Sequence, residues 1–456
     1  MTEHKNRDII EFPNTSDLRL SEDQMALEFV QAECHRRRYV ALWHKWMRFG
    51  DDIWCPDETY ETFDAIRPIV RARANSVLRE GKSIARAIKL SSAATVAGVE
   101  KLARSDRRVA ATSDQWDNDP MVLGVPGGVI DLSTGKMRPA TPEDYLTRRA
   151  SVLPDPSMPT PVWDAFLDFV TESDKDYADY LQRMCGYCLT GSTVEQVLFF
   201  VYGDGGNGKS VFVEVLARIL TGYHQVAAME TFIDTGRTSH PTDLAMLRAA
   251  RLVTAQETEQ GRRWNESRIK QLTGGDQITA RFMRQDFFTF TPQFKLVISG
   301  NHKPSLKSVD EAMRRRMRLL PFVRKVPDDE IDLQLLDKLM FEAPGILAWM
   351  IQGCLSWQLQ GLGSCTKVDD ATIDYLREED AIGNWISDCC VQQADAFESS
   401  AKLFESWKCY AEAANEHAGN KKSFSQALLK RGFLSGRKGQ ARGFMGITVK
   451  SGAPHG

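Results

Sequence analysis

The chain has 456 residues, of which 42% are hydrophobic and 26% are charged, and its formal net charge at pH 7 is −3. This length accommodates two to four domains, and the composition is that of an ordinary soluble globular protein. The small negative charge excludes a uniformly basic nucleic-acid-binding protein, so any basic surface must be local.

The sequence lacks the features of membrane and secreted proteins. No apolar run approaches the roughly 20 residues of a membrane span, and the N-terminus lacks the apolar core of a signal peptide. Nine cysteines without framework spacing favour a reducing compartment, so we expect a cytoplasmic protein with no membrane partner. Cys185 and Cys188 form a C-x-x-C pair, which we interpret as buried helix cysteines rather than as a redox or zinc site.

The N-terminal part is predicted to be mainly helical. Helical periodicity runs over residues 21–40 and 60–112, and residues 50–52 are expected to turn a hairpin. Residues 36–38, three arginines, are interpreted as a solvated face. The tryptophans around the turn are expected to form the core of the hairpin, with base stacking as the alternative: Trp43, Trp46 and Trp54.

The composition changes at residue 119, where short strands and turns replace helices up to residue 135. Four prolines between residues 154 and 161 form a linker, and residues 163–191 are helical again. These changes predict a mainly helical domain with a small hairpin (1–115), a mixed strand and helix collar (116–190), an α/β core (191–345), and a helical linker with a C-terminal domain (346–456).

Residues 203–210 fit the pattern G-x-x-x-x-G-K-[ST] of a phosphate-binding P-loop. They follow a short apolar run, 197–202, that predicts a buried parallel strand, and they precede a helical pattern over 211–220. The glycines let backbone amides curl toward phosphate oxygens, Lys209 should reach the β- and γ-phosphates, and Ser210 should bind Mg²⁺. A chance glycine-rich turn is the alternative. The residues expected to hold ATP are Gly203, Asp204, Gly205, Gly206, Asn207, Gly208, Lys209 and Ser210.

Two acidic residues follow the next predicted strand, 251–256. A P-loop ATPase needs a carboxylate there to order the Mg²⁺ shell and to activate the attacking water. Glu257 is the first candidate and Glu259 the second, with an exposed acidic turn as the alternative. A further buried strand, 295–300, is followed by Asn301, which is suited to hold the lytic water or to sense the γ-phosphate.

Residues 277–282 and 287–291 alternate in polarity and predict a β-hairpin with Arg284 at its tip. Arg281 and Lys270 are its expected neighbours. Projecting cations of this kind would bind the phosphates of a DNA backbone, and an ordinary exposed hairpin is the alternative.

Four arginines lie between residues 314 and 318. They form either a solvated face or the site of an arginine finger, which would reach the γ-phosphate held by a neighbouring copy of the chain. A finger that acts on a neighbour implies a ring of subunits.

The C-terminal residues 420–450 contain eight lysines or arginines and no acidic residue. An amphipathic helix over 423–432, a basic loop over 435–443 and a last strand over 444–449 form the pattern of a winged helix. Such a domain usually binds duplex DNA, and protein binding is the alternative. The expected DNA contacts of the loop are Arg437, Lys438 and Arg442.

The order of these motifs resembles that of superfamily 3 helicases, and more narrowly that of the phage and plasmid primase-helicases, a group that includes the poxvirus primase-helicase. The resemblance covers nearly the whole chain. Residues 60–190 carry three short segments of it, at 118–120, 127–135 and 186–191.

This resemblance implies an α/β, AAA+-like P-loop core that forms a homo-hexameric ring on single-stranded DNA, with ATP and Mg²⁺ as cofactors and a winged helix on duplex DNA. It implies a role for each candidate residue. Lys209 and Ser210 match the Walker A pair, Glu257 the Walker B acid, with Glu259 as a further Mg²⁺ ligand, Asn301 the sensor, Arg315 or Arg316 the finger, and Arg284 the DNA-binding hairpin.

The resemblance also sets the expected function. Long members of the family carry a primase domain, whereas only about sixty residues precede the helical domain here, too few for a catalytic primase domain. We therefore expect an ATP-dependent DNA helicase of a phage, prophage or plasmid, in the cytoplasm of a bacterial host, with a separate primase and other replication proteins as partners. The alternatives are a nucleotide-switched initiator or regulator that binds DNA without unwinding it, and a small-molecule P-loop kinase.

Overall fold

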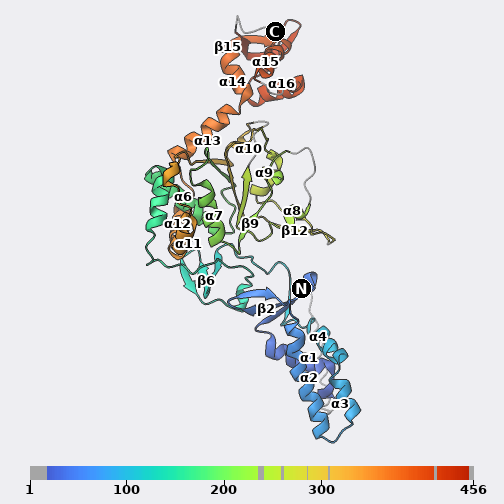
Figure 1. Ribbon diagram of the computed structural model, residues 1–456. Helices are drawn as coiled ribbons and strands as arrows, with labels where there is room; N and C mark the ends of the chain where they lie inside the picture. The colour runs from blue at the N-terminus through green and yellow to red at the C-terminus, as the bar shows by residue number, and fades with distance from the viewer. Residues whose placement is uncertain are drawn as a thin grey trace.

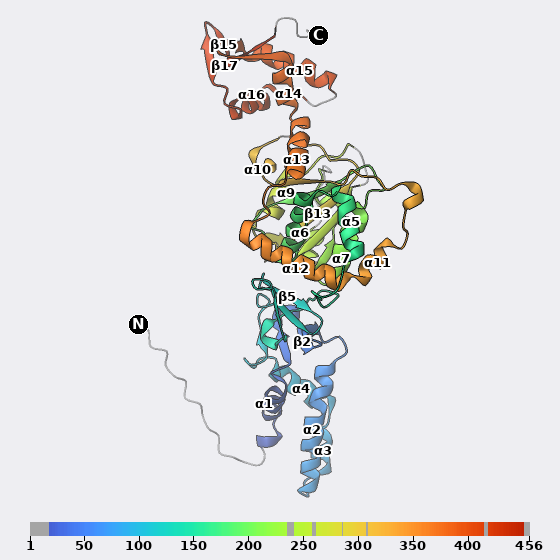
Figure 2. The ribbon, with the colours of Figure 1, turned by 90° about the vertical axis from the view of Figure 1, so that its left-hand side faces the viewer.

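The computed structural model describes residues 18–234, 241–257, 261–284, 286–306, 309–414 and 418–450, with only the backbone for Pro241 and Glu257. The molecule is elongated: an α/β core lies between a helical N-terminal part and a small C-terminal part (Figures 1 and 2). Within the described residues no single helix is long and apolar enough to cross a membrane. Two helices joined at a bend of 72°, Leu335–Phe341 and Ala343–Gln360, would pass that test together.

The N-terminal part combines helices with a four-stranded sheet of order β3-β2-β1-β4. Apolar side chains of α1, α2, α3 and α4 pack into one buried cluster, which joins the sheet through Tyr39 and Trp46. The elements are η1 (Leu18–Leu20), α1 (Glu22–Glu33), β1 (Arg37–Val40), η2 (Ala41–Trp43), β2 (Lys45–Gly50), β3 (Ile53–Pro56), α2 (Glu61–Arg79), α3 (Ile84–Leu90), α4 (Ala93–Ala103) and β4 (Ala110–Ala111).

The predicted hairpin is confirmed, whereas the helix predicted over 21–40 is too long. The chain turns between β2 and β3 at Asp51 and Asp52, both of which have positive φ angles. Trp46 and Trp54 are buried, as expected of hairpin core. The helix ends at Glu33, and residues 37–40 form β1 instead, because they pair with β2 across the sheet.

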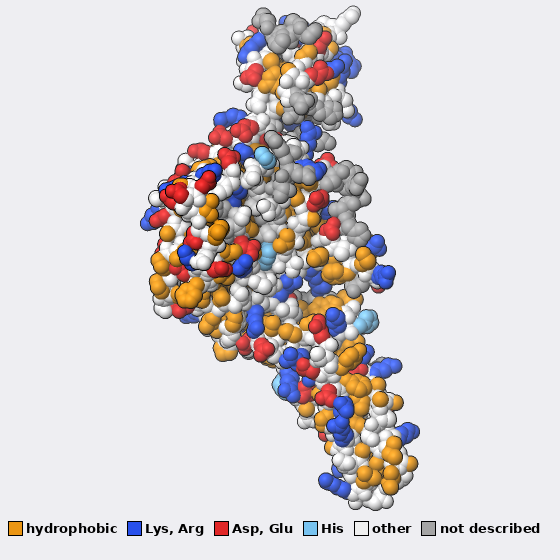
Figure 3. All heavy atoms as spheres, in the orientation of Figure 1, with side chains coloured by type: hydrophobic (Ala, Val, Ile, Leu, Met, Phe, Trp, Pro, Cys, Tyr) orange, Lys and Arg blue, Asp and Glu red, His pale blue; other side chains and the backbone are white. Residues whose placement is uncertain are grey.

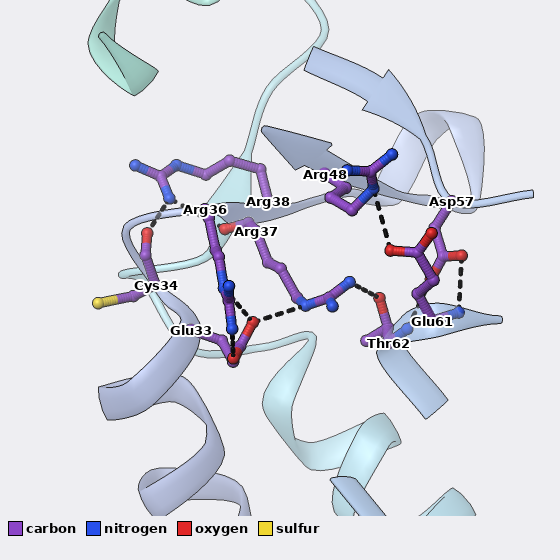
Figure 4. A network of polar contacts seen from close by, with 9 residues as sticks. All are labelled: Glu33, Cys34, Arg36, Arg37, Arg38, Arg48, Asp57, Glu61 and Thr62. Carbon is purple, nitrogen blue, oxygen red and sulfur yellow. Dashed lines mark hydrogen bonds and ion pairs between the residues drawn. The ribbon is translucent and has the colours of Figure 1, made fainter. Parts of the chain in front are cut away.

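The interpretation of residues 36–38 as a solvated face is wrong for two of the three arginines. Arg37 is buried: its Nε donates to Glu33 Oε2 (2.9 Å) and its Nη1 to Thr62 Oγ1 (3.0 Å), as Figure 4 shows. The guanidinium of Arg38, also buried, lies 5.3 Å from the ring centre of Trp54. Burial opposes ionisation of Glu33, but its hydrogen bonds with Arg36 and Arg37 outweigh burial, so its pKa lies below the ordinary value.

A small antiparallel sheet and two helices connect this part to the core, in agreement with the strands and turns predicted after residue 119. The helix predicted over 163–191 is two helices, because Glu172 and Ser173 adopt positive φ angles between them. The elements are β5 (Val122–Val125), β6 (Gly128–Asp131), β7 (Lys136–Arg138), η3 (Pro142–Asp144), α5 (Pro161–Thr171) and α6 (Lys175–Leu189).

Five parallel strands form the core sheet, in the order β14-β8-β13-β10-β9. Its strands are β8 (Leu198–Tyr202), β9 (His224–Val226), β10 (Leu252–Glu257), β13 (Lys295–Gly300) and β14 (Met317–Pro321). The remaining elements are α7 (Lys209–Ile219), η4 (Met229–Thr231), α8 (Pro241–Ala245), α9 (Glu266–Thr273), β11 (Ile278–Ala280), β12 (Phe288–Phe290), α10 (Glu311–Arg314), η5 (Asp328–Glu330), α11 (Leu335–Phe341), α12 (Ala343–Gln360) and α13 (Thr366–Glu378). The α/β class and the parallel sheet are confirmed.

Both faces of this sheet are buried, which explains why its strands are continuous apolar runs. Successive side chains of a strand point to opposite faces. Phe199 and Val201 of β8 pack with α5, α6, α7 and α12, whereas Leu198 and Phe200 pack with α9, α13 and the segment around Trp264.

Two buried cations fasten the start of the sheet strands to the preceding segments. Arg251 donates to the carbonyl oxygens of Leu189 (2.6 Å) and Val122 (2.7 Å). Lys295 donates to the carbonyl oxygens of Thr190 and Gln293, and burial lowers its pKa to about 7. These bonds hold the segments before the core against the start of β10 and β13.

Cys185 and Cys188 lie on α6 and are buried, as interpreted from the sequence. Burial raises the pKa of both thiols, to about 12 for Cys188. A thiol of this kind is inert at neutral pH.

The C-terminal part follows α13 and contains a three-stranded antiparallel sheet of order β15-β17-β16. The helix predicted over 423–432 is present as α16, but the basic loop predicted over 435–443 is wrong. Those residues form β16 and the start of β17, which pair closely around Gly439 and Gln440. The elements are α14 (Ala381–Cys389), β15 (Cys390–Ser399), α15 (Ser400–Ala413), α16 (Lys421–Lys430), β16 (Ser435–Lys438) and β17 (Ala441–Val449).

Candidate functional site

The glycine-rich loop and two other predicted site positions meet at the carboxyl edge of the core sheet. Because all five strands are parallel, their carboxyl ends lie along one edge, where ligands of open α/β sheets bind. Gly300 of β13 pairs with Tyr202 of β8 on one side and with Glu257 of β10 on the other. Three predicted site positions therefore lie side by side along this edge: the loop after β8, Asn301 after β13 and the backbone of Glu257.

The loop after β8 is a cradle that tolerates only glycine at key positions. Gly203 has a φ of +156°, and a Cβ atom there would lie 2.0 Å from the carbonyl oxygen of Phe322. Gly208 has a φ of +83°, and a Cβ atom there would lie 2.9 Å from a ring carbon of Phe166. A side chain at either position would therefore collide with the groups that surround the loop.

The side chains of Lys209 and Asn207 are hydrogen-bonded to each other inside this loop. The Nζ of Lys209 donates to the carbonyl oxygen of Gly203 (2.6 Å) and to Oδ1 of Asn207 (2.9 Å). Asn207 in turn donates through Nδ2 to the carbonyl oxygen of Phe322 (2.6 Å). Burial lowers the pKa of Lys209. The ammonium group is therefore held in place by acceptors that a phosphate oxygen can replace.

The segment after β14 forms the second wall of the loop, which sequence reasoning missed. The amide of Phe322 donates to the carbonyl oxygen of Tyr202 (2.8 Å), and that of Val326 to Gly206 (2.7 Å). The exposed Lys325 lies over the loop, since a Cβ atom on Gly206 would be 3.6 Å from its side chain. The signal was in the sequence, because two basic residues, Arg324 and Lys325, lie within four residues of the end of β14.

The predicted metal ligands are only partly brought together. Ser210 is exposed in the first turn of α7, and the backbone of Glu257 ends β10, two strands away from β8. Glu259 lies outside the described residues. In the parts of the chain that the structure describes, no group of three or more His, Cys, Asp or Glu side chains could hold a metal. Mg²⁺ commonly binds one or two carboxylates plus substrate phosphates, so it does not need such a group.

The two arginines offered as a finger have different environments. Arg316 is buried, and it donates through Nε to Thr273 Oγ1 (3.1 Å) and through Nη1 to the carbonyl oxygen of Ala312 (2.9 Å). Arg315 is exposed at the end of α10, directly before β14. β14 spans five residues, which corresponds to about 17 Å. Arg315 thus lies at the amino edge of the sheet, across the sheet from the loop of its own chain.

The predicted hairpin is formed by β11 and β12, and it projects from the core at the right of Figure 1. Arg284 is exposed in the connection, with a φ of +61°. The guanidinium of Arg281 lies 4.7 Å from the ring centre of Phe287. Lys270 does not join them, because it lies on α9 and pairs with Asp310 (2.5 Å). Sequence reasoning missed the exposed apolar residues beside these arginines: Phe282, Met283 and Phe287.

Three exposed cations predicted to bind DNA, Arg437, Lys438 and Arg442, lie together on the β16–β17 hairpin. Arg437 and Arg442 are direct cross-strand partners. Like charges in this position destabilise a sheet. A bound anion would relieve the repulsion.

Two family models match the chain. One, described as "D5 N terminal like", matches residues 28–172, and one described as a family of unknown function, DUF5906, matches residues 201–316. The second range begins just before the glycine loop and ends at Arg316.

Several viral proteins are similar to the chain. "Putative helicase L207/L206" of Acanthamoeba polyphaga mimivirus is 24% identical over 60% of this chain and 31% of its own length. "Putative helicase 022R" of Frog virus 3 is 22% identical over 71% of this chain and 42% of its own length. The chain thus spans about a third to two fifths of the length of these relatives. Together with the D5 match, they show that the chain is similar to parts of viral proteins that are named as putative helicases.

The apo structure of the NrS-1 C-terminal region has a similar fold. It aligns with a TM-score of 0.52 at 10% sequence identity, over 94% of this chain and all of that chain. At this identity the likeness concerns the fold alone.

Proposed function

We propose that this chain is an ATP-driven DNA helicase motor with a P-loop, AAA+-like core of the superfamily 3 kind. The proposal rests on one observation, the order of the five parallel strands. In that order the loop of Lys209 and the ends of β13 and β10 share one edge of the sheet, while Arg315 lies at the opposite edge. A site that needs both edges must be shared by two copies of the chain.

ATP and Mg²⁺ would be held at the carboxyl edge. The loop amides from Gly203 to Gly208 would donate to phosphate oxygens, and Lys209 would exchange its two loop acceptors for phosphate oxygens. Ser210, with Glu257 or Glu259, would hold Mg²⁺, the ion that neutralises phosphate charge. The carboxylate of Glu257 would then accept a proton from the attacking water, which Asn301 would orient.

Arg315 is a better finger than Arg316. The guanidinium of Arg316 already donates to Thr273 and Ala312 inside its own subunit, so a reach outward would leave buried acceptors unpaired. Arg315 is exposed and would approach the γ-phosphate bound by a neighbouring copy. Copies joined head to tail in this manner close into a ring, which we propose to be a homo-hexamer.

DNA would contact two separate hairpins. Arg284 and Arg281 on the β11–β12 hairpin would bind a single strand, and the exposed aromatic side chains beside them add surfaces on which bases stack. Lys270 would contribute less, since Asp310 already neutralises it. The C-terminal part would act as a winged helix, with Arg437, Lys438 and Arg442 on duplex DNA.

Replacement of Arg284 by alanine should reduce strand displacement at least about tenfold, because one charge-assisted hydrogen bond contributes about 1.5–3 kcal/mol. The ATPase rate should stay within about twofold, because Phe288 of the hairpin lies against Arg248, which precedes β10 at the opposite, amino edge of the sheet. Displacement of a labelled strand from a forked duplex measures the first quantity, and phosphate release measures the second.

Lys136→Ala is the matched control for this experiment, because it removes an exposed cation from another small sheet, at β7. It should displace strands like the unchanged protein. If Arg284→Ala does so too, the hairpin does not bind the moving strand.

A nucleotide-switched DNA-binding initiator is the second candidate, favoured by the paired cations of the β16–β17 hairpin, which lie outside the core. The same strand-displacement assay decides between the two. An unchanged protein that binds duplex DNA and hydrolyses ATP without displacing a strand is an initiator and not a helicase.

A further inference from the structure

An apolar groove lies far from the candidate site, near the end of the helical N-terminal part, where α3 packs across α2 (Figure 1). Its volume is about 330 Å³. Three branched aliphatic side chains in it face solvent: Leu78 of α2 is 46% exposed, and Ile84 and Ile88 of α3 are 68% and 66% exposed. The other lining residues are Arg71, Ala74, Asn75, Ala87 and Ser91.

The arrangement differs from scattered surface apolar residues, which need no explanation. Ile84 and Ile88 are four residues apart and so share one face of α3. Leu78 meets them from a second helix. In Figure 3, apolar side chains gather at this end of the molecule.

The groove also lies in the most basic part of the helical region. Residues 67–89 contain seven lysines or arginines and one acidic residue, in a chain whose net charge is −3. Some of these cations have acidic partners: Arg67 pairs with Asp64 (2.7 Å), Arg73 with Glu28 (2.5 Å) and Lys82 with Glu80 (2.8 Å). Arg71 lines the groove itself, and Figure 3 shows basic side chains around the apolar ones.

An apolar floor with a basic rim is complementary to one class of partner. A helix with aliphatic residues on one face and acidic residues on its flanks would bury the first against the groove and pair the second with the rim. A nucleic acid would use the cations but not the aliphatic floor, and none of the eight lining residues is an aromatic platform for a base. The groove volume is near the lower end of the range of about 300–1,000 Å³ for ligand pockets. A groove of this size can take up a few side chains from one face of a helix.

We propose that the α2–α3 groove binds an acidic amphipathic helix of a partner protein. Leu78, Ile84 and Ile88 receive its apolar face. Arg71, which lines the groove, and Arg79, an exposed residue two i+4 steps further along the same face of α2, face its acidic flanks. The groove belongs to a different part of the chain from the glycine loop, so the partner is tethered without obstructing the core.

The test uses the full chain and a fluorescent synthetic peptide of about 15 residues, with leucines at helical positions i, i+4, i+7 and i+11 and glutamates elsewhere. Fluorescence anisotropy should report saturable binding that weakens with salt. The same residues in scrambled order should bind at least about tenfold more weakly, because their apolar face is lost.

Two variants locate the site. Ile84→Asp/Ile88→Asp should weaken peptide binding at least about tenfold, and Arg71→Glu/Arg79→Glu should weaken it and remove most of its salt dependence. Leu359→Asp is the matched control, since Leu359 is 89% exposed at the end of α12. All three should keep the thermal unfolding temperature and the ATPase rate, because the changed side chains are exposed.

Several results would overturn the proposal. One is the absence of saturable binding, and another is equal affinity for the scrambled peptide. Unchanged binding by both groove variants would move the site elsewhere. A single-stranded oligonucleotide that displaces the peptide, and that itself binds Ile84→Asp/Ile88→Asp more weakly, would assign the groove to nucleic acid.

Discussion

Replacement of Lys209 by alanine should lower the ATPase rate by at least about 10²–10³, because it removes the buried positive charge that we propose binds the phosphates. The buried ammonium group lies in the loop itself, where it donates to the carbonyl oxygen of Gly203 and to Oδ1 of Asn207. No other described lysine occupies that position. Phosphate release at saturating ATP measures the effect.

The thermal unfolding temperature of Lys209→Ala shows whether the fold is kept. It should fall only slightly, because about one or two hydrogen bonds of about 1 kcal/mol each are lost. Lys338→Ala on α11 is a suitable control. Lys338 pairs with Asp332 on the surface, and we assign it no role in nucleotide binding. A folded Lys209→Ala protein with normal turnover would remove the loop from the chemistry.

Replacement of Arg315 by alanine should lower the ATPase rate by about 10³–10⁵, the range for loss of an arginine finger. Binding of nucleotide should change much less, because a finger acts mainly on the charge that develops in the transition state. Comparison of turnover with the affinity for a fluorescent ATP analogue separates the two effects.

The neighbouring arginines give this experiment its controls. Arg314→Ala also removes an exposed arginine of α10, and it should keep most of the ATPase rate. Arg316→Ala should lower stability by about 1–3 kcal/mol, because Thr273 and Ala312 lose a buried partner. A stable, inactive Arg316→Ala protein beside an active Arg315→Ala protein would show that the finger is Arg316.

Much of the core could be predicted because its signals are local. Strands buried on both faces are continuous apolar runs, so β8, β10 and β13 stand out in the sequence, and the glycine loop falls between a strand and a helix as its geometry demands. The β11–β12 hairpin was equally visible from its alternation. The order of the strands in the sheet was not visible, because it depends on contacts between distant segments.

The predictions that were wrong also failed because contacts between distant segments decide the structure. Residues 37–40 continue a helical pattern but pair with β2, and the buried Arg37 binds Thr62, 25 residues away. The basic residues after 435 resemble a loop because they are polar, but β15 and β17 give them a sheet to join. Arg315 and Arg316 are adjacent in sequence and identical in type. Only the burial of Arg316 in the folded protein distinguishes them as candidates for the finger.

The central claim is that ATP is hydrolysed at a seam to which two copies of the chain contribute, and mixing two inactive variants tests it directly. In an equimolar mixture of Lys209→Ala and Arg315→Ala subunits, about a quarter of the seams join an intact Lys209 to an intact Arg315, if copies assemble at random. We predict that this mixture regains ATPase activity far above that of either variant alone. A mixture that forms oligomers by light scattering, yet hydrolyses ATP no faster than the sum of its parts, would contradict the claim.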